Sequence, residues 1–326
     1  MKRIPALLLG IVLLLTGCAC SETPAPTPMP SAQTRSIDPV YHLPDELAVD
    51  ESGVPLVEVY RTDSKAVETM SLESYLMGVV AGEMHPDWPI EALKAQAIIA
   101  RTFALRFIAD GGSKYEGAML STDITEAQAY DIEAVNESVR QAVQDTLGQV
   151  ILYDGEPIHA WFHAHAGGVT AGAQEGLDYQ EEEPPYTRSI QVRESSDAPE
   201  DVRNWTAQFP LTQVQQALDK LGGGDANQLA IGKRGSSGRV ITFTAGNEPI
   251  SAVQLRLALD STRMKSTLLS DLTVSDGIVT MKGSGYGHGV GMSQWGAYEM
   301  AADGKRAEEI INKFYQNIEI RQVYDK

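Results

Sequence analysis

The chain has 326 residues and a strong acidic excess, with 44 Asp and Glu against 26 Lys and Arg and a formal net charge of −18 at pH 7. This charge repels polyanions, and because no basic run is present, binding to nucleic acid is not expected. Both cysteines, Cys18 and Cys20, lie near the N-terminus. The rest of the chain therefore offers no disulfide, no thiolate metal cage and no cysteine nucleophile.

The N-terminus has the features of an export signal. Lys2 and Arg3 precede an apolar run over residues 7–15, which is too short for an ordinary transmembrane helix. The sequence Leu-Thr-Gly-Cys that ends at Cys18 is typical of a lipobox. We expect residues 1–17 to be a lipoprotein signal peptide and Cys18 to carry a lipid anchor on the extracytoplasmic face of the cell membrane. An uncleaved membrane-spanning segment is the alternative.

A tether is expected to follow the lipid anchor. Residues 18–50 are rich in Ser, Thr and Pro, and prolines alternate between positions 24 and 30, which is typical of a semi-extended linker. Residues 51–326 are expected to form the folded part of the protein. This length is sufficient for one large domain, or for two lobes, with a substantial buried core.

The first elements predicted after the tether are a strand over residues 56–60 and two helices separated by a proline-containing turn. The first helix ends around Glu83, and the second starts near Pro89, whose missing N–H is tolerated in a first helical turn. Lys94 and Arg101 are seven residues apart and share one face of the second helix. An acid at a helix end beside cations indicates chemistry, although a solvated acid with surface ion pairs gives the same pattern.

The remaining elements are a mixture of helices and short strands. Further helices are predicted over residues 135–147, 211–221 and 253–259. A strand over residues 150–153 turns at an Asp-Gly pair and returns over residues 157–166, which predicts a hairpin. The mixture predicts an α+β fold, with one large domain built around a substrate cleft.

The returning strand has an unusual polar and aromatic face. It would place His159, Trp161, His163 and His165 on the same side. Three imidazoles on one side could bind zinc, but no HExxH-type helix and no thiolate accompanies them. We therefore favour the wall of a polar groove and expect neither a metal nor a cofactor.

Glycine occupies every other position from residue 283 to residue 291, with Tyr286 and His288 in between. The segment fits neither the dinucleotide-binding pattern nor the P-loop. In an extended segment, these glycines would let a ligand or another chain approach one side while Tyr286 and His288 project from the other. Tight packing alone would also explain the glycines. Ser293 invites a serine-hydrolase interpretation, but no G-x-S-x-G elbow and no third catalytic residue is present. A groove wall is the simplest interpretation.

Four separated blocks of the sequence resemble the stage II sporulation protein D family (SpoIID/LytB). They are residues 76–84 with 91–97 and 100–102, residues 128–130, residues 167–170 and residues 287–297. The resemblance implies a peptidoglycan lytic transglycosylase, a carbon–oxygen lyase that cleaves glycan strands denuded of stem peptides to 1,6-anhydromuramic acid ends. Glu83 matches the family's catalytic glutamate, which acts first as a general acid and then as a base.

The expected substrate-binding residues surround this acid or lie in the later blocks. They are Lys94, Gln96, Arg101, Gln128, Tyr130, Tyr286, His288, Ser293 and Gln294. We expect Lys94 and Arg101 to hold the lactyl carboxylate of a muramic acid that has lost its peptide. Some family members carry zinc on Cys and His residues just before the Gln-x-Tyr element, but Thr122, Glu126 and Ala127 stand in that region here. Metal dependence is therefore not carried over from the family.

The resemblance implies a role in cell-wall remodelling during sporulation, with peptidoglycan glycan strands and a cell-wall amidase as partners. Two other functions are left open. One is a non-catalytic glycan-binding modulator that enhances an amidase, and the other is a structural lipoprotein scaffold. Glu83 favours catalysis, because a pure binder has no chemical need for a protonated carboxyl. A scaffold explains the tether but not the block around His288.

Overall fold

The computed structural model describes residues 41, 43, 47–246 and 248–324. These residues belong to one compact unit. The predicted signal peptide, Cys18 and most of the predicted tether lie outside the described residues. No helix within the described part of the chain has the length and apolar character needed to cross a bilayer.

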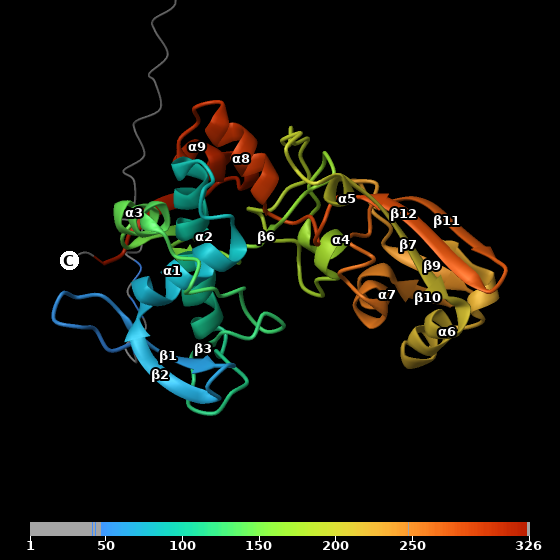
Figure 1. Ribbon diagram of the computed structural model, residues 1–326, viewed down its shortest axis with the longest axis horizontal. Coiled ribbons are helices and arrows are strands. Elements are labelled where there is room, and N and C mark those ends of the chain that lie inside the picture. Colours follow the sequence, from blue (N-terminus) through green and yellow to red (C-terminus); the bar gives the residue numbers. More distant parts are fainter. Residues whose placement is uncertain (1–40, 42, 44–46, 247, 325–326) are drawn as a thin grey trace, which may run out of the picture. The chain divides into compact units, whose positions relative to one another are not determined.

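The helices differ widely in length (Figure 1), and the longest, α2, contributes many buried residues to the largest hydrophobic core of the described residues. In chain order they are α1 (Leu72–Glu83), α2 (Ile90–Ala109), α3 (Glu137–Asp145), α4 (Ala173–Leu177), α5 (Glu200–Arg203), α6 (Leu211–Lys220), the 3₁₀ turn η1 (Ala226–Gln228), α7 (Ala252–Leu259), α8 (Gln294–Ala302) and α9 (Ala307–Phe314).

The strands form several small sheets rather than one continuous sheet. They are β1 (Leu56–Arg61), β2 (Ala66–Ser71), β3 (Leu120–Ser121), β4 (Gln149–Tyr153), β5 (Glu156–Pro157), β6 (Phe162–His163), β7 (Asn204–Pro210), β8 (Leu229–Ile231), β9 (Thr242–Ala245), β10 (Pro249–Ser251), β11 (Leu269–Ser275), β12 (Ile278–Ser284), β13 (Met292–Ser293) and β14 (Glu319–Gln322).

The sheets have the strand orders β2-β1-β3, β10-β9-β8, β11-β12-β7, β13-β6 and β14-β4-β5. Their pairs are antiparallel except β1 with β3 and β6 with β13, which are parallel. Separate small sheets with helices packed beside them confirm the predicted α+β fold class.

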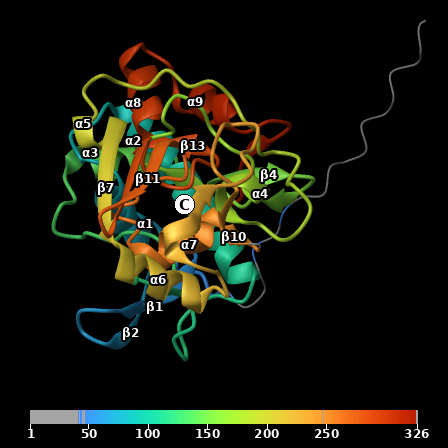
Figure 2. The same ribbon diagram turned by 90° about the vertical axis from the view of Figure 1, so that its right-hand side faces the viewer.

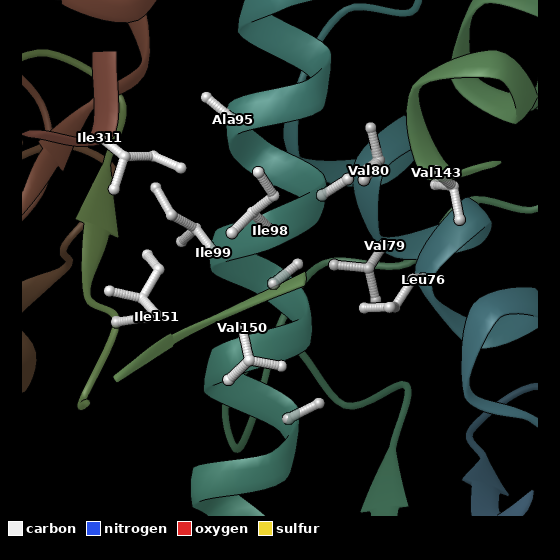
Figure 3. Packing of buried hydrophobic residues seen from close by; sticks show 14 of the residues in the cluster. Leu76, Val79, Val80, Ala95, Ile98, Ile99, Val143, Val150, Ile151 and Ile311 are labelled. Carbon is white, nitrogen blue, oxygen red and sulfur yellow. The ribbon is translucent and has the colours of Figure 1, made fainter. Parts of the chain in front are cut away.

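The larger core holds the end of α1 in place. Ser71 caps α1, because its hydroxyl oxygen accepts the Ser74 N–H at 3.2 Å. Apolar residues of α1 and α2 then face each other at helical spacing, and α3 packs against both helices. Figure 3 shows Val80 of α1 and Ile98 of α2 within this packing. Glu83, the last residue of α1, is thereby held by a rigid helix rather than by a loop.

A second core is built from the sheets β11-β12-β7 and β10-β9-β8 together with α6 and α7. Along β7, buried Trp205, Ala207 and Phe209 alternate with exposed polar residues, as expected for a sheet with one face in the core. Figure 2 shows α6 and α7 side by side, in agreement with their residue contacts. The predicted helices over residues 211–221 and 253–259 correspond to α6 and α7.

Residues 157–166 do not form the predicted long returning strand. Ladder pairing is limited to β5 and β6, because the chain leaves the β14-β4-β5 sheet and pairs with β13 instead. The expected alternation is also wrong. His163 and His165 are buried, whereas Phe162 is half-buried. Burial along this segment therefore does not follow the two faces of a single strand.

The glycine-rich segment is irregular rather than a continuous strand. Gly287 and Gly291 have φ angles of 106° and 70°, in the left-handed region that favours glycine. A Cβ on Gly287 would lie 2.7 Å from the His163 Cβ, and one on Gly291 would lie 1.9 Å from the Trp161 carbonyl oxygen. The alternation of glycine thus reflects backbone conformation as well as the close approach of residues 161–163.

Candidate active site

A cavity of about 280 Å³ opens at the end of α1. Segments that are distant in sequence supply its walls, from α1 and α2 through the loop after β3 and the chain around β6 to the glycine-rich segment and α8. The lining residues are Glu83, Phe103, Ile124, Ala127, Gln128, Trp161, Phe162, His163, Ala164, Tyr286, Gly287, His288 and Gln294. Within this lining, Glu83 is the one carboxylate.

Glu83 is a half-buried acid whose pKa is raised. Burial raises the pKa of its carboxyl from 4.5 to about 7, although hydrogen bonds from Ala129 and Gln294 act in the opposite direction. The Ala129 N–H donates to Glu83 Oε1 at 2.6 Å. The carbonyl end of α1 adds a partial negative charge that also disfavours the carboxylate. Near neutral pH, Glu83 therefore populates both its protonated and its ionised form.

The loop after β3 packs closely against α1 at two glycines of the helix, Gly78 and Gly82. A Cβ on Gly78 would lie 2.3 Å from the Tyr130 ring, and one on Gly82 would lie 2.7 Å from the Tyr130 backbone nitrogen. This close approach brings Gln128 into the cavity lining and the Ala129 N–H to the acid. Tyr130 itself does not line the cavity and packs against α1, with the Arg61 guanidinium 5.2 Å from its ring centroid.

Two histidines of the cavity wall are held in their neutral forms. Burial, with the nearby charges of Arg256 and Arg239, lowers the pKa of His288 to about 3. Burial also lowers the pKa of His163 well below its ordinary value, with His288 and Arg239 acting in the same direction. His288 Nδ1 accepts the Val290 N–H at 3.0 Å, which leaves the proton on Nε2. His288 and Tyr286 thus form part of the groove wall, as the sequence indicated.

The glycine-rich segment is anchored by a buried arginine that the sequence did not reveal. The Arg239 side chain donates to the Val169 and Ala166 carbonyl oxygens, both at 2.8 Å. A Cβ on Gly289 would lie 2.3 Å from its Nη2 atom. Arg239 therefore joins the Gly-Gly-Val-Thr block to the His288 block. Neither its spacing nor its surroundings in the sequence signal this role.

Ser293 is completely buried beside the cavity and does not line it. Its hydroxyl donates to Glu194 and also caps α8 by accepting the Gly296 N–H at 3.2 Å. His165 Nδ1 lies 3.1 Å from the other Glu194 oxygen. Ser293 is thus bonded to the acid and not to the imidazole, so the three residues do not form a nucleophilic triad. In this arrangement Ser293 shapes the wall rather than contacting a ligand.

Three of the expected substrate-binding residues of α2 do not line the cavity. Lys94 pairs with Glu91 at 3.1 Å and with Asp145 at 2.9 Å. Arg101 is fully buried, and its guanidinium donates to both carboxylate oxygens of Glu73 at 2.8 and 2.6 Å. This placement corrects the expectation that Arg101 meets a lactyl carboxylate. Its shared helix face with Lys94 instead serves internal ion pairs.

Gln96 is also buried away from the cavity lining. Its amide atoms have no hydrogen-bond partner among the described residues. Gln294 differs, because its Nε2 donates to the Glu83 backbone carbonyl. No group of three or more His, Cys, Asp or Glu side chains in the described part of the chain is arranged to hold a metal ion.

Aromatic and apolar side chains line the cavity beside the residues that the sequence indicated as substrate-binding. Trp161 lines the cavity and stacks on His159 with ring centroids 4.9 Å apart. Tyr179 meets the Trp161 ring edge-on at 5.5 Å. Phe103 and Ile124 also line the cavity, and Ile124 is 69% exposed. The arrangement offers one titratable acid among neutral polar and aromatic groups, which suits a ligand with hydroxyl groups and apolar ring faces.

Comparison with known proteins identifies two matching families. The family described as stage II sporulation protein matches residues 60–153, and a domain of unknown function (DUF8618) matches residues 176–291. Stage II sporulation protein D of Bacillus amyloliquefaciens is 32% identical over 295 residues, a match that covers 85% of this chain and 81% of that protein. Its counterpart in Bacillus subtilis (strain 168) is 30% identical over 282 residues, with 82% and 79% covered.

A further relative has a different name. The amidase enhancer of Bacillus subtilis (strain 168) is 26% identical over 287 residues. This match covers 74% of the present chain but 39% of the relative.

Proposed function

The chain belongs to the stage II sporulation protein D family, and we propose that it is a peptidoglycan lytic transglycosylase that remodels the cell wall in sporulation. The observation that carries the proposal is Glu83, a single carboxyl with a pKa of about 7 in a cavity lined by neutral and aromatic side chains. The proposed substrate is a glycan strand denuded of its stem peptides.

In the proposed reaction Glu83 acts twice. Its protonated carboxyl donates to the glycosidic oxygen while the bond from that oxygen to the muramyl C1 breaks. The resulting carboxylate then takes the proton of the muramyl C6 hydroxyl, whose oxygen bonds to C1 and closes the 1,6-anhydro ring. The proton is returned to Glu83 and no water is consumed. A pKa near the working pH serves both steps.

The composition of the cavity agrees with this chemistry. Glycoside hydrolases use two carboxylates, one as acid and the other as base or nucleophile, whereas an intramolecular attack by the C6 hydroxyl needs one group. The cavity lining contains Glu83 and no second carboxylate. The neutral states of His163 and His288 also favour this role, because imidazolium charges there would stabilise the Glu83 carboxylate and lower its pKa.

We assign substrate contacts to the sequence-selected residues that line the cavity. These are Gln128, Tyr286, His288 and Gln294. The two nitrogens of His288 face backbone groups of Val290 and Phe162, so its contribution to a sugar is the surface of the ring. Lys94 and Arg101 have no role in this assignment, because both are engaged by carboxylates elsewhere.

The proposal includes the site of action. A lipid on Cys18 would hold the protein on the extracytoplasmic face of the membrane, within reach of the cell wall. Replacement of Cys18 by Ala is expected to move the protein from the membrane fraction to the soluble fraction. Retention of the Cys18→Ala variant in the membrane would contradict lipid anchoring.

The similarity to an amidase enhancer supports a second candidate function. In this alternative, the cavity binds glycan without cleaving it, and the bound protein increases the activity of a cell-wall amidase. The raised pKa of Glu83 favours the catalytic proposal, because binding alone does not require a carboxyl that titrates near neutral pH.

One experiment separates the two functions. Wild type, Glu83→Gln and the surface control Glu133→Gln are each incubated with amidase-treated peptidoglycan, and the products are analysed by mass spectrometry. We expect wild type and Glu133→Gln to release fragments with 1,6-anhydromuramic acid ends. Glu83→Gln should be slower by about 100-fold or more, because it can neither donate nor accept the proton.

A second assay adds a purified amidase and intact peptidoglycan. If no anhydro ends form while wild type and Glu83→Gln raise the amidase rate equally, the modulator function replaces the enzyme. Hydrolytic reducing ends in place of anhydro ends would also contradict the proposal, because they require attack by water.

A further inference from the structure

The segment that delivers the Ala129 N–H to Glu83 has no regular secondary structure. It runs from the end of β3 at Ser121 to Asp131. Its backbone hydrogen bonds include a turn in which the Glu126 and Ala127 N–H groups donate to the Asp123 carbonyl oxygen, but no ladder, so side-chain contacts contribute much to its conformation. The 2.6 Å bond from the Ala129 N–H to Glu83 Oε1 is therefore only as well defined as the contacts that hold this segment.

On one side, the segment rests on α1. The Asp131 N–H donates to the Gly78 carbonyl oxygen at 2.9 Å, and the Tyr130 ring covers Gly78. These contacts fix the end of the segment that follows Ala129. They do not fix the part that precedes it.

On the other side, the Glu126 carboxylate holds the part of the segment that precedes Ala129. Glu126 accepts the Lys114 N–H at 2.5 Å through Oε1 and the Ser113 hydroxyl at 2.9 Å through Oε2. Its Oε2 also accepts the hydroxyl of Ser121. Burial raises the pKa of Glu126, but these hydrogen bonds together outweigh it and lower the pKa below its ordinary value. Glu126 is thus ionised, and its carboxylate links residues 113–114 to the segment that ends at Ala129. We call this link the clasp.

The partner side of the clasp is itself anchored. The Tyr115 ring stacks on Tyr60 of β1 with centroids 3.8 Å apart and planes 10° apart. Asp123 accepts the Tyr115 hydroxyl and the Lys114 ammonium, each at 2.8 Å. A continuous set of contacts therefore leads from β1 through Glu126 to the loop over the cavity.

We propose that Glu126 is a positioning residue for Glu83, because its carboxylate ties the 121–131 segment to residues 113–114 and so holds the Ala129 N–H at the acid. Its effect on catalysis rests on the proposed function. Its effect on the loop and on the state of Glu83 does not.

Loss of the Glu126 contacts is expected to change the pKa of Glu83 in one direction. Ala127 and Gln128 line the cavity, so a displaced segment admits water to Glu83. Burial is the largest cause of the raised pKa of Glu83, and hydration therefore lowers this pKa toward its ordinary value despite the loss of the Ala129 bond. Glu83 then loses its proton at a lower pH than it does with the clasp intact.

Other titratable groups face the two glutamates. Around Glu83 they are Tyr75, His163 and His288, and around Glu126 they are Tyr75, Lys114 and Asp123. Tyr75 has a raised pKa and stays neutral, and the two histidines have lowered pKa values, so a shift measured between pH 5 and 9 reports on Glu83.

The test compares Glu126→Ala and Glu126→Gln with the matched control Glu116→Ala. Glu116 is an exposed acid in the neighbouring loop, so its replacement makes the same change in charge. Each protein is studied by amide hydrogen exchange of residues 123–131, by NMR titration of the Glu83 carboxyl and by the rate of cleavage of peptide-free glycan as a function of pH.

We expect faster exchange at Ala129 in both Glu126 variants and wild-type exchange in Glu116→Ala. In Glu126→Ala, kcat should fall by about 10- to 100-fold with a much smaller change in KM, because the acid is mispositioned rather than the substrate lost. The alkaline limb of the kcat profile should move to lower pH by about one unit. Glu126→Gln keeps one acceptor oxygen and should show part of each effect.

Unchanged exchange at Ala129 and an unchanged Glu83 titration in both Glu126 variants would overturn the proposal. An equal effect of Glu116→Ala would also overturn it, since the cause would then be net charge. If wild type cleaves no glycan, the proposed function fails, while exchange and titration still decide the role of Glu126. If Glu126→Ala does not fold, Glu126→Gln decides it.

Discussion

Gln294, the first residue of α8, donates its side-chain amide to the backbone carbonyl of Glu83, the last residue of α1, with Nε2 and the oxygen 3.0 Å apart. The last carbonyls of a helix lack intrahelical partners, so this bond satisfies a group that would otherwise need water. It also fixes the end of α1 against an element more than 200 positions away in sequence.

Replacement of Gln294 by Ala is therefore expected to loosen the acid. The loss of one partly buried hydrogen bond should lower the free energy of unfolding by about 1 kcal/mol. Under the proposed function, kcat should fall by about tenfold because the carboxyl is less well positioned. Urea unfolding and steady-state kinetics on peptide-free glycan measure the two effects.

Gln316→Ala provides the control for this prediction. The Gln316 amide also donates to a backbone carbonyl at 3.0 Å, that of Pro185, but Gln316 does not line the cavity. We expect a small loss of stability and an unchanged kcat in this variant. Equal losses of kcat in the two variants would mean that Gln294 has no special relation to Glu83.

The raised pKa of Glu83 predicts a dependence of stability on pH. The folded protein holds this proton more tightly than the unfolded chain, with a pKa of about 7 against 4.5. The ionised acid therefore costs stability, and this cost grows as pH rises from about 4.5 to 7 and is constant above that range. Because Glu83 is half-buried, we expect the cost at pH 8 to be about 1–3 kcal/mol.

Glu83→Gln should consequently be more stable than wild type at pH 8 and nearly equal to it at pH 4. Urea unfolding of both proteins across this range measures the difference, in which contributions from other titrating groups cancel. A variant that is less stable than wild type at pH 8 would contradict the raised pKa.

The pairing of α1 with α2 and the position of Glu83 could be predicted from the sequence, because both depend on local helical spacing and on a proline-marked turn. Tyr286 and His288 could be predicted as wall residues because glycines surround them. The loop that carries Ala129 could not be predicted, because its conformation depends on hydrogen bonds that the Glu126 side chain accepts from a separate loop. Such contacts leave no periodic signal.

The orientation of the Arg101 side chain could not be predicted from the sequence for a similar reason. Helical spacing places Arg101 and Lys94 on one face, but it does not say which elements cover that face. Arg101 pairs with Glu73, and the hydroxyl of Tyr324 also donates to Glu73 at 2.5 Å. Tyr324 lies far from Arg101 in sequence, so only the folded chain brings the group together.

Arg101→Met should accordingly destabilise the fold without a direct effect on ligand binding. Removal of the guanidinium leaves the Glu73 carboxylate buried without its cation, which costs about 3–5 kcal/mol. The double variant Glu73→Gln/Arg101→Met has no buried charge and should recover about half of this loss or more. Chemical unfolding gives both values.

Binding separates this structural role from the role first expected for Arg101. Under conditions in which Arg101→Met is folded, we expect wild-type affinity for peptide-free glycan by calorimetry. Loss of affinity with little change in stability would restore Arg101 as a ligand for the lactyl carboxylate.

The contact between Gly78 and Tyr130 gives a test of how the loop that carries Tyr130 packs on α1. A Cβ on Gly78 would come 2.3 Å from the Tyr130 ring, so Gly78→Ala must displace this ring and the loop with it. Overpacking of this kind costs about 1–3 kcal/mol, against a small gain from the helix propensity of alanine. The displaced loop would also withdraw the Ala129 N–H from Glu83, so kcat should fall together with stability.

A double-mutant cycle shows whether the clash is the cause. Tyr130→Ala removes the ring, and Gly78→Ala introduced into that background should then be neutral or slightly stabilising, because alanine favours the helix. Thermal and urea unfolding of the four proteins give the coupling between the two positions. Additive effects would mean that Gly78 is required for a reason other than the approach of Tyr130. Other contacts would then have to hold the loop against α1.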